Sequence, residues 1–217
     1  MPELPEVETT KRGIEPYLRN QTIEKIKVRN NKLRIPFNQS LAKNIINTDI
    51  KEIRRRAKYI IFEFSNSYSM VIHLGMTGNL RVSKQIKYLK HDHIIFYLSS
   101  GNVLIYNDVR RFGLIQIYRT DESFFLLDNN GPDPFEKKAN ADYLFNKIKN
   151  STASIKSILL NHKVISGIGN IYASEILFAT NISPTRKGKD VSYDECKKIL
   201  KESKTVSYTH LTLPTNA

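Results

Sequence analysis

The stretch NNGPDPFE at residues 129–136 constrains the fold most, because it separates two parts of the chain with different sequence patterns. A short run that contains glycine and two prolines is typical of a turn or linker. Before it, short segments rich in β-branched and aromatic residues predict strands, and after it amphipathic segments predict helices. The sequence therefore predicts an α+β protein with one domain over residues 1–130 and a second over residues 131–205.

The first domain is predicted to be one helix followed by a β-sandwich. In LPEVETTKRGIEPYL, the residues Leu4, Val7, Ile14 and Leu18 recur at helical spacing behind an acidic first turn that contains proline. The strand segments that follow are TIEKIKVRN, YIIFEF, YSMVIHL, HIIFYL, NVLIYND and GLIQIYR.

The second domain is predicted to be helical over ADYLFNKIKN, SIKSILLN, NIYASEILFAT and YDECKKILKES. Within KVISGIGNIYASEILF, Gly167 and Gly169 precede a helix that begins near Asn170. Backbone N–H groups at such a helix start bind phosphate well. The turn follows a helix rather than a strand and completes no GxGxxG, so a dinucleotide site is disfavoured. The segment instead resembles a DNA-binding helix–turn–helix variant.

The last stretch, VSYTHLTLPTNA at residues 206–217, contains no charged residue and shows no helical period. It is either a natural tail or foreign sequence on an incomplete reading frame, such as translated adapter or vector. We favour foreign sequence.

The charge of the chain points to a polyanion partner. Lys and Arg number 34 against 21 Asp and Glu, a net charge of +13. Phosphate neutralisation makes nucleic acid the favoured partner over a merely solvated basic surface. We expect a cytoplasmic protein without a membrane partner, because no apolar run approaches roughly 18 residues and the acidic start is unlike a signal peptide. A single cysteine, Cys196, excludes internal disulfides and a multi-cysteine metal site.

The opening MPELPE has two interpretations. Pro and Glu are common at helix starts, and this hexapeptide alone favours that interpretation. However, removal of Met1 would leave Pro2 with a free secondary amine that can attack a sugar aldehyde carbon. An α-amino group titrates near pH 8, and a helix N-terminus would lower its pKa further. Glu3 and Glu6 are close enough in the sequence to move protons.

Two further motifs suggest contacts with an opened duplex. In HLGMTGNLR, a glycine-flanked turn can push Met76 outward as an apolar wedge, although an ordinary turn is as good an interpretation. In YNDVRRFG, Arg110 and Arg111 beside Phe112 can fill the gap that an everted base leaves, although a strand-end Phe is more often core.

The tripeptide HDH at residues 91–93 suggests a metal site, because alternate residues of a strand share a face. No third ligand accompanies His91 and His93, so the sequence favours no metal. A phosphate contact from His91 stays open.

Together these motifs resemble those of bacterial formamidopyrimidine-DNA glycosylases, the branch of the Fpg/Nei family that excises 8-oxoguanine. MPELPEVET, RRAKYI, HLGMTGNLR, NDVRRFG and KVISGIGNIYASE occur in the family's order. The resemblance implies a bifunctional DNA glycosylase/AP lyase of base-excision repair, whose helical domain carries a helix–two-turn–helix element that binds DNA. It also implies a monomeric, nucleoid-associated enzyme whose partner is damaged double-stranded DNA.

The resemblance implies catalytic roles for three residues. Pro2 would be the Schiff-base nucleophile, and Glu3 would be the acid/base that opens the deoxyribose ring. Lys58, in RRAKYI, would donate a proton in β-elimination and contact a phosphate.

The resemblance also implies DNA contacts. Met76, Arg110 and Phe112 would fill the space of the flipped nucleotide, with Arg110 pairing to the orphaned cytosine. The residues that would hold the DNA backbone or handle the lesion are His73, His91, Lys156, Asn170 and Tyr172.

The chain departs from the family's pattern at its C-terminal side. A segment that closes over the flipped base and a four-cysteine zinc finger are expected there, so we interpret the chain as C-terminally truncated, with no cofactor of its own. Ser151 and Thr152 also stand where a lysine is often found. Two alternatives stay open: a non-catalytic basic DNA-binding fragment, and an endonuclease VIII-like glycosylase for oxidised pyrimidines.

Overall fold

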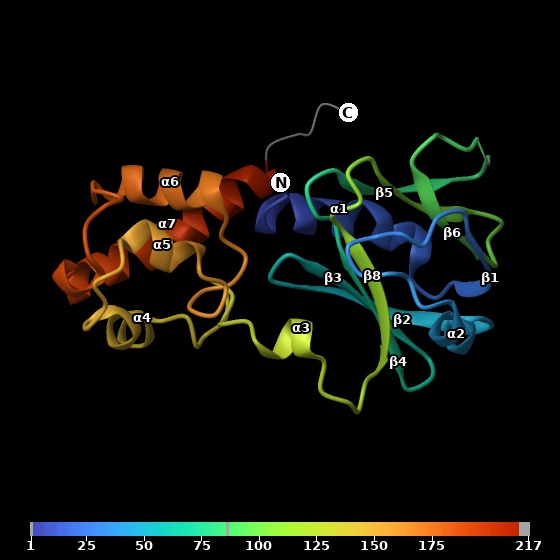
Figure 1. Ribbon diagram of the computed structural model, residues 1–217, viewed down its shortest axis with the longest axis horizontal. Helices are drawn as coiled ribbons and strands as arrows, with labels where there is room; N and C mark the ends of the chain where they lie inside the picture. Colours follow the sequence, from blue (N-terminus) through green and yellow to red (C-terminus); the bar gives the residue numbers. More distant parts are fainter. Residues whose placement is uncertain (1, 86, 213–217) are drawn as a thin grey trace. The chain divides into compact units, whose positions relative to one another are not determined.

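The computed structural model describes residues 2–85 and 87–212, and only the backbone of residues 208–212. Contacts divide the chain into two compact units (Figure 1). The N-terminal unit holds Pro2 and residues Val7–Phe124, and the main part of the C-terminal unit begins at Phe125. The residues Glu3–Glu6 group with the C-terminal unit, although they lie at the other end of the sequence. The predicted division at residue 130 therefore lies a few residues beyond the one that contacts define.

The N-terminal unit is built on an antiparallel sheet. Among the described residues, eight strands follow the order β5-β7-β6-β1-β2-β3-β4-β8. The strands are β1 (Thr22–Val28), β2 (Thr48–Arg56), β3 (Tyr59–Phe64), β4 (Tyr68–His73), β5 (Gly78–Ser83), β6 (Asp92–Leu98), β7 (Val103–Asp108) and β8 (Leu114–Arg119). Strands β1 and β2 pair only through Thr22 with Asp49 and Ile23 with Thr48. This short junction joins two four-stranded halves.

The two halves of the sheet share one hydrophobic core, which confirms the predicted sandwich. Phe62 and Met70 come from one half, and Phe96 and Leu104 come from the other. Helix α1 (Leu4–Leu18) has the predicted bounds and adds Val7, Ile14 and Leu18 to the same core. Alternation along each strand turns these side chains to one face, where burial away from water stabilises the fold.

Several elements within residues 19–128 were not predicted. They are the strands β2 and β5, helix α2 (Gln39–Ala42), the 3-10 helix η1 (Lys43–Ile45) and the short helix α3 (Phe125–Asp128) that opens the C-terminal unit. Strand β2 ends in three successive arginines, which mask its alternation, yet Ile50 and Ile53 on it are buried. Strand β5 starts on a turn glycine, Gly78, so its sequence resembles a loop.

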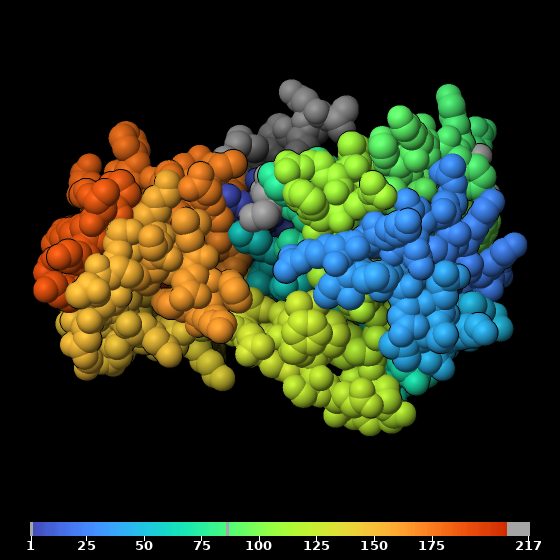
Figure 2. All heavy atoms as spheres, in the orientation of Figure 1, coloured from blue at the N-terminus to red at the C-terminus, as the bar shows by residue number. Residues whose placement is uncertain are grey.

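The C-terminal unit is helical, as predicted. Its further elements are α4 (Ala141–Ile148), α5 (Ile155–Leu160), α6 (Asn170–Ala179), the 3-10 helix η2 (Gly188–Asp190) and α7 (Tyr193–Thr212). Helices α4 and α5 begin at Asn140 and Ser154, whose side chains accept backbone N–H groups as N-caps. In the space-filling view, helices α4–α7 form one closely packed body coloured from amber to red (Figure 2). Its core includes Leu144, Ile158, Ile176 and Cys196.

Helix α7 continues past the point where the sequence loses its helical period. The helix runs to Thr212, with Val206 packed against the core and Ser207 buried. The origin of residues 206–217 stays a prediction, and residues 213–217 lie outside the described residues. Within the described part of the chain, no helix is long and apolar enough to cross a membrane.

Candidate functional site

The carboxylate of Glu3 sits on the N-terminus of helix α6, within the C-terminal unit. It accepts hydrogen bonds from the backbone N–H groups of Gly169, Ile171 and Tyr172 at 2.8, 3.0 and 3.2 Å. The residue at the N-cap position, Gly169, has no side chain to cap the helix. Glu3 therefore supplies the missing cap from 166 residues away, and it is only 2% exposed. The phosphate site expected at this helix start is filled by a carboxylate.

Gly169 is required for this arrangement. A Cβ added there would lie 2.4 Å from the Glu3 Cδ and Oε1 atoms. Any larger residue would therefore displace the carboxylate. The backbone of Leu4 adds a further link, because its N–H donates to the Gly167 carbonyl at 3.1 Å.

Glu6 forms a second carboxylate contact at the same place. It accepts a hydrogen bond from the Glu3 backbone N–H at 2.8 Å and another from the Tyr172 hydroxyl at 2.8 Å. Burial, the bond to Glu6 and the nearby carboxylates raise the pKa of Tyr172. Tyr172 is thus a buried donor to Glu6, whereas Asn170, two residues earlier, is exposed. Pro2 is half-buried and directly precedes Glu3, so it is covalently next to this cluster.

Lys156 lies elsewhere in the C-terminal unit. Its Nζ donates to the Ser174 hydroxyl at 3.0 Å, which joins α5 to α6. Lys156 lines a pocket of about 540 Å³ with Phe178, whose ring is 86% exposed. The predicted lesion contact is therefore accessible on this unit.

Lys58 stands in the N-terminal unit, in the tight turn between β2 and β3. Ala57 before it has a positive φ of 54°, and its carbonyl accepts a hydrogen bond from Arg55 at 2.9 Å. Arg55 is held in turn by Glu8 of α1 at 3.1 Å. The turn that presents Lys58 is therefore fixed to helix α1 by an ion pair.

His73 ends strand β4 as a neutral imidazole. Burial, with the nearby charges of Arg34 and Lys58, lowers the pKa of His73 to about 4. Its Nδ1 accepts the Gly75 N–H at 3.0 Å, so the Nε2 atom carries the proton. The ring also packs against Tyr59 with the centroids 5.0 Å apart.

Met76, Arg110 and Phe112 stand on two neighbouring loops of the N-terminal unit. Met76 is on the β4–β5 turn and is 39% exposed, and Phe112 is on the β7–β8 loop and is 47% exposed. The Arg110 guanidinium lies over the Phe112 ring at 4.7 Å. Exposed apolar side chains beside a stacked cation suit insertion between bases, which is the role predicted for them.

A buried carboxylate that the sequence reasoning missed, Asp108, joins these two loops. It accepts hydrogen bonds from the Thr77 hydroxyl at 2.5 Å, the Gly113 N–H at 2.9 Å and the Tyr106 hydroxyl at 3.2 Å. Its backbone carbonyl accepts the His93 Nε2–H at 2.7 Å. The only signal in the sequence was an acid between Asn107 and two arginines in NDVRRFG.

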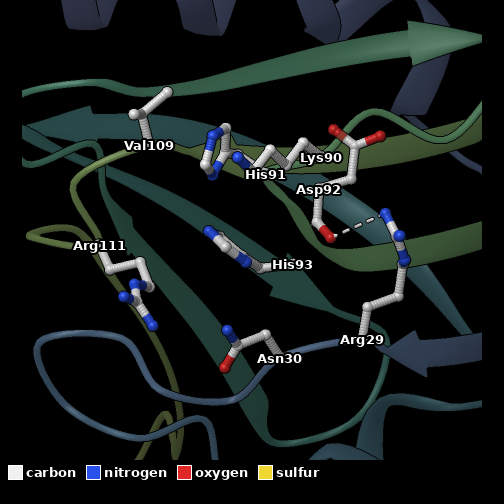
Figure 3. A pocket seen from close by; sticks show the side chains of 8 residues that line it. All are labelled: Arg29, Asn30, Lys90, His91, Asp92, His93, Val109 and Arg111. Carbon is white, nitrogen blue, oxygen red and sulfur yellow. Dashed lines mark hydrogen bonds between the residues drawn. The ribbon is translucent and has the colours of Figure 1, made fainter.

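His91 belongs to a basic pocket of about 340 Å³ (Figure 3). Its lining residues are Arg29, Asn30, Lys90, His91, Asp92, His93, Val109 and Arg111. His91 precedes strand β6, so the strand alternation assumed for HDH does not apply. Burial opposes ionisation of Asp92, but hydrogen bonds from Arg81, Leu89 and Asn107 hold the pKa of Asp92 low. With that carboxylate paired, the free lining charge is positive and suits a phosphate.

The described residues do not provide a zinc site. Among residues 2–85 and 87–207, no three His, Cys, Asp or Glu side chains are grouped as metal ligands would be. Cys196 is fully buried in the helical core, where burial raises the pKa of its thiol to about 11. A thiol in that state is a packing residue.

Comparisons with known proteins agree with the two-part organisation. The family model of the formamidopyrimidine-DNA glycosylase N-terminal domain matches residues 1–115, and that of the formamidopyrimidine-DNA glycosylase H2TH domain matches residues 130–212. H2TH denotes the helix–two-turn–helix element expected here.

Similar proteins carry the same name. The formamidopyrimidine-DNA glycosylase of Rickettsia massiliae is 41% identical over 210 residues, which cover 95% of this chain and 75% of the relative. The formamidopyrimidine-DNA glycosylase of Hydrogenovibrio crunogenus is 43% identical over 208 residues, which cover 95% of this chain and 74% of the relative. The crystal structure of the Lactococcus lactis enzyme bound to DNA with an AP site matches this chain with a TM-score of 0.90 and 30% sequence identity. The match covers 97% of this chain and 82% of the Lactococcus lactis chain.

An N-terminal helix, an antiparallel sandwich and an H2TH region define a DNA glycosylase of base-excision repair. The chain belongs to the formamidopyrimidine-DNA glycosylase family. The expected fold and family are thus confirmed, and the chain spans about three quarters of the length of these relatives.

Proposed function

We propose that this glycosylase excises 8-oxoguanine and formamidopyrimidines from double-stranded DNA and then nicks the strand as an AP lyase. The observation that carries the proposal is the Glu3 carboxylate, held by three backbone N–H groups directly after Pro2. A carboxylate fixed beside an N-terminal secondary amine provides the two groups that Schiff-base chemistry on a sugar needs.

Pro2 would act as the nucleophile once Met1 is removed. The nitrogen lone pair attacks C1′ of the damaged nucleoside, the bond from C1′ to the base breaks, and the base leaves with a proton. Opening of the sugar ring then places a proton on O4′ and leaves an iminium between C1′ and the Pro2 nitrogen. This intermediate makes the C2′ hydrogen acidic, so loss of that proton expels the 3′ phosphate by β-elimination.

Glu3 and Lys58 would move the protons. Glu3 would deliver the proton to O4′, and its fixed position keeps the reacting atoms aligned. Lys58 would serve β-elimination and contact a phosphate from the turn that Arg55 holds. A second elimination at the 5′ phosphate would complete a δ step. Pro2, Glu3 and Lys58 would supply the nucleophile and the proton transfers, so we expect the chain itself to need no cofactor.

The remaining residues would hold an opened duplex. Met76, Arg110 and Phe112 would occupy the space of the everted nucleotide, and Arg110 would pair with the orphaned cytosine. Everting a base costs a few kcal/mol, and inserted side chains offset part of that cost. The residues that would contact the DNA backbone or the lesion are His73, His91, Lys156 and Asn170, whereas Tyr172 is buried and donates its hydroxyl to Glu6. One protein molecule would hold one lesion, so we expect a monomer. Because its substrate is DNA, we expect it to work at the nucleoid.

Borohydride trapping tests the proposal. The full chain is incubated with a duplex that holds one abasic site, and reduction should convert the iminium into a stable covalent complex. Pro2→Gly should remove most of the trapped band. Pro16→Ala is the matched control, because Pro16 is an exposed proline of helix α1. A wild-type chain that binds DNA without trapping would instead support the non-catalytic DNA-binding fragment.

Oxidised pyrimidines are a second candidate substrate, supported by a specific observation. A solved structure of the wild-type Lactococcus lactis enzyme, with a TM-score of 0.91 and 30% identity to this chain, holds DNA that contains an oxidised pyrimidine. Single-turnover rates on duplexes with 8-oxoguanine and with an oxidised pyrimidine separate the two. A faster rate on the pyrimidine would favour the endonuclease VIII-like alternative.

A further inference from the structure

The turn that carries Met76 and the loop that carries Phe112 are held together from inside the N-terminal unit. Exposed loops are ordinarily mobile, and ordering them on binding costs free energy. Here Thr77, next to Met76, donates to Asp108 at 2.5 Å and accepts the Arg110 backbone N–H at 3.0 Å. The Thr77 hydroxyl thus bonds two groups of the other loop region. One is the carboxylate of Asp108, which ends strand β7, and the other is the backbone N–H of Arg110 in the β7–β8 loop.

The two backbones also touch directly. Gly75 has a positive φ of 64°, and a Cβ placed on it would lie 2.4 Å from the Gly113 nitrogen and 2.5 Å from the Phe112 carbonyl carbon. On the other side, Gly113 donates its own N–H to Asp108. The carboxylate is 0% exposed, so its bonds are shielded from water and hold the loops firmly.

We propose that Asp108 and Thr77 are positioning residues that hold Met76, Arg110 and Phe112 as one preformed wedge for insertion into the duplex. This inference rests on the proposed function. Neither Asp108 nor Thr77 projects toward DNA in this role. They act by fixing the spacing of the three exposed side chains, so that insertion costs little additional ordering.

Insertion into the duplex and Schiff-base formation at Pro2 depend on the wedge differently. A preformed wedge matters where a base must leave a stacked duplex. It does not matter for Schiff-base formation on a single-stranded abasic oligonucleotide, which has no partner strand to replace. Loss of the wedge should therefore slow insertion and leave the Pro2 chemistry intact.

The test uses Thr77→Val in the full chain. Valine keeps the shape of threonine, and Asp108 keeps its bonds to Tyr106 and Gly113. The matched control is Thr22→Val, because Thr22 also donates its hydroxyl to an aspartate of the same unit, Asp49, at 2.7 Å. Stopped-flow fluorescence reports insertion, with 2-aminopurine opposite a stable abasic analogue. Borohydride trapping on a single-stranded abasic oligonucleotide reports Pro2.

We expect Thr77→Val to slow or weaken insertion by roughly tenfold, the scale of one hydrogen bond to a charged group. Trapping on the single strand should stay within about twofold of wild type. The inference is overturned if Thr77→Val and Thr22→Val insert alike, or if Thr77→Val loses trapping in parallel with insertion.

The outcomes also separate this inference from the proposed function. A wild-type chain that inserts without being trapped, with insertion lost in Thr77→Val, supports the wedge and refutes the Pro2 chemistry. A wild-type chain that is trapped but gives no insertion signal refutes the wedge alone. A wild-type chain that gives neither signal refutes both.

Discussion

His73 shows how one half-buried side chain determines what a site can offer to DNA. Its Nδ1 atom is occupied by the Gly75 N–H, and its lowered pKa of about 4 keeps the ring neutral at pH 7. A phosphate at His73 would therefore meet a neutral Nε2–H donor rather than a positive charge. Charge neutralisation near the lesion must come from other residues, such as Lys58 and Arg34, which themselves disfavour protonation of His73.

A pH titration tests this state of His73. An NMR titration of its imidazole should have a midpoint near pH 4. In the unfolded chain a histidine titrates near pH 6.5, so between these values the unfolded state binds more protons. The free energy of unfolding should therefore fall as the pH falls from about 6.5 toward 4. His73→Asn, whose amide oxygen can accept the Gly75 N–H, should flatten part of that slope. A midpoint near 6.5 in the folded protein would contradict the assignment.

Glu3 has a structural role that can be measured apart from catalysis. Glu3→Gln replaces a carboxylate that accepts three N–H groups with an amide whose NH₂ cannot accept any. We expect the free energy of unfolding to fall by roughly 2 kcal/mol. Glu15→Gln is the control, because Glu15 forms an i,i+4 surface pair with Lys11 worth about 0.5 kcal/mol. Equal stability of the two variants in chemical denaturation would remove the capping role.

At the scale of elements, the start of helix α6 depends on the absence of a side chain at Gly169. Gly169→Ala would push its Cβ into the Glu3 carboxylate, so we expect lower stability, by roughly 1–3 kcal/mol. Gly13→Ala provides the matched control. A Cβ at Gly13, inside α1, meets nothing within 4 Å, so this change should raise stability by about 1 kcal/mol.

The midpoint temperature of thermal unfolding should therefore fall for Gly169→Ala and rise for Gly13→Ala. A shift in the same direction would show that the close approach of Glu3 to α6 does not determine the effect.

The elements also show what the sequence could and could not reveal. Helix α1 and strand β3 were predicted with their observed bounds, since each has an undisturbed period and clear ends. Strand β2 was missed because its last residues are all arginine, so the local pattern hid a strand that pairs with β3 from Ile50 to Arg56. Propensity is a weak guide where the neighbouring strand supplies the stability.

In the candidate site, too, local sequence revealed some features and tertiary contacts determined others. The motif residues were found because each lies in a short stretch with its own chemistry. The bond from Glu3 to Gly169 could not be found in that way, because it joins residues 166 apart. Asp108 gave no local sign of its role, since the partner Thr77 lies in another motif 31 residues earlier. Sequence therefore supplied candidate residues, and tertiary structure supplied what holds them.

At the scale of the whole molecule, the net charge of +13 makes DNA binding a matter of ionic strength. Each phosphate that a protein neutralises steepens the fall of log K against log salt by about 0.9. The slope measured for this chain therefore counts its phosphate contacts. It also allows the contribution of the quarter of the family's length that this chain does not cover to be measured directly.

A chimera provides that measurement. The part of the Hydrogenovibrio crunogenus relative that this chain does not cover is fused after Ser207, which keeps the residues of helix α7 that pack in the helical core. We expect tighter binding to abasic-site DNA and a salt slope steeper by about 0.9 for each phosphate that the added segment contacts. The control is a Gly/Ser extension of equal length, which adds chain without adding charge. Fluorescence anisotropy across a range of salt concentrations gives both slopes. Parallel slopes for chimera and control would mean that the residues present here already make the phosphate contacts of the family.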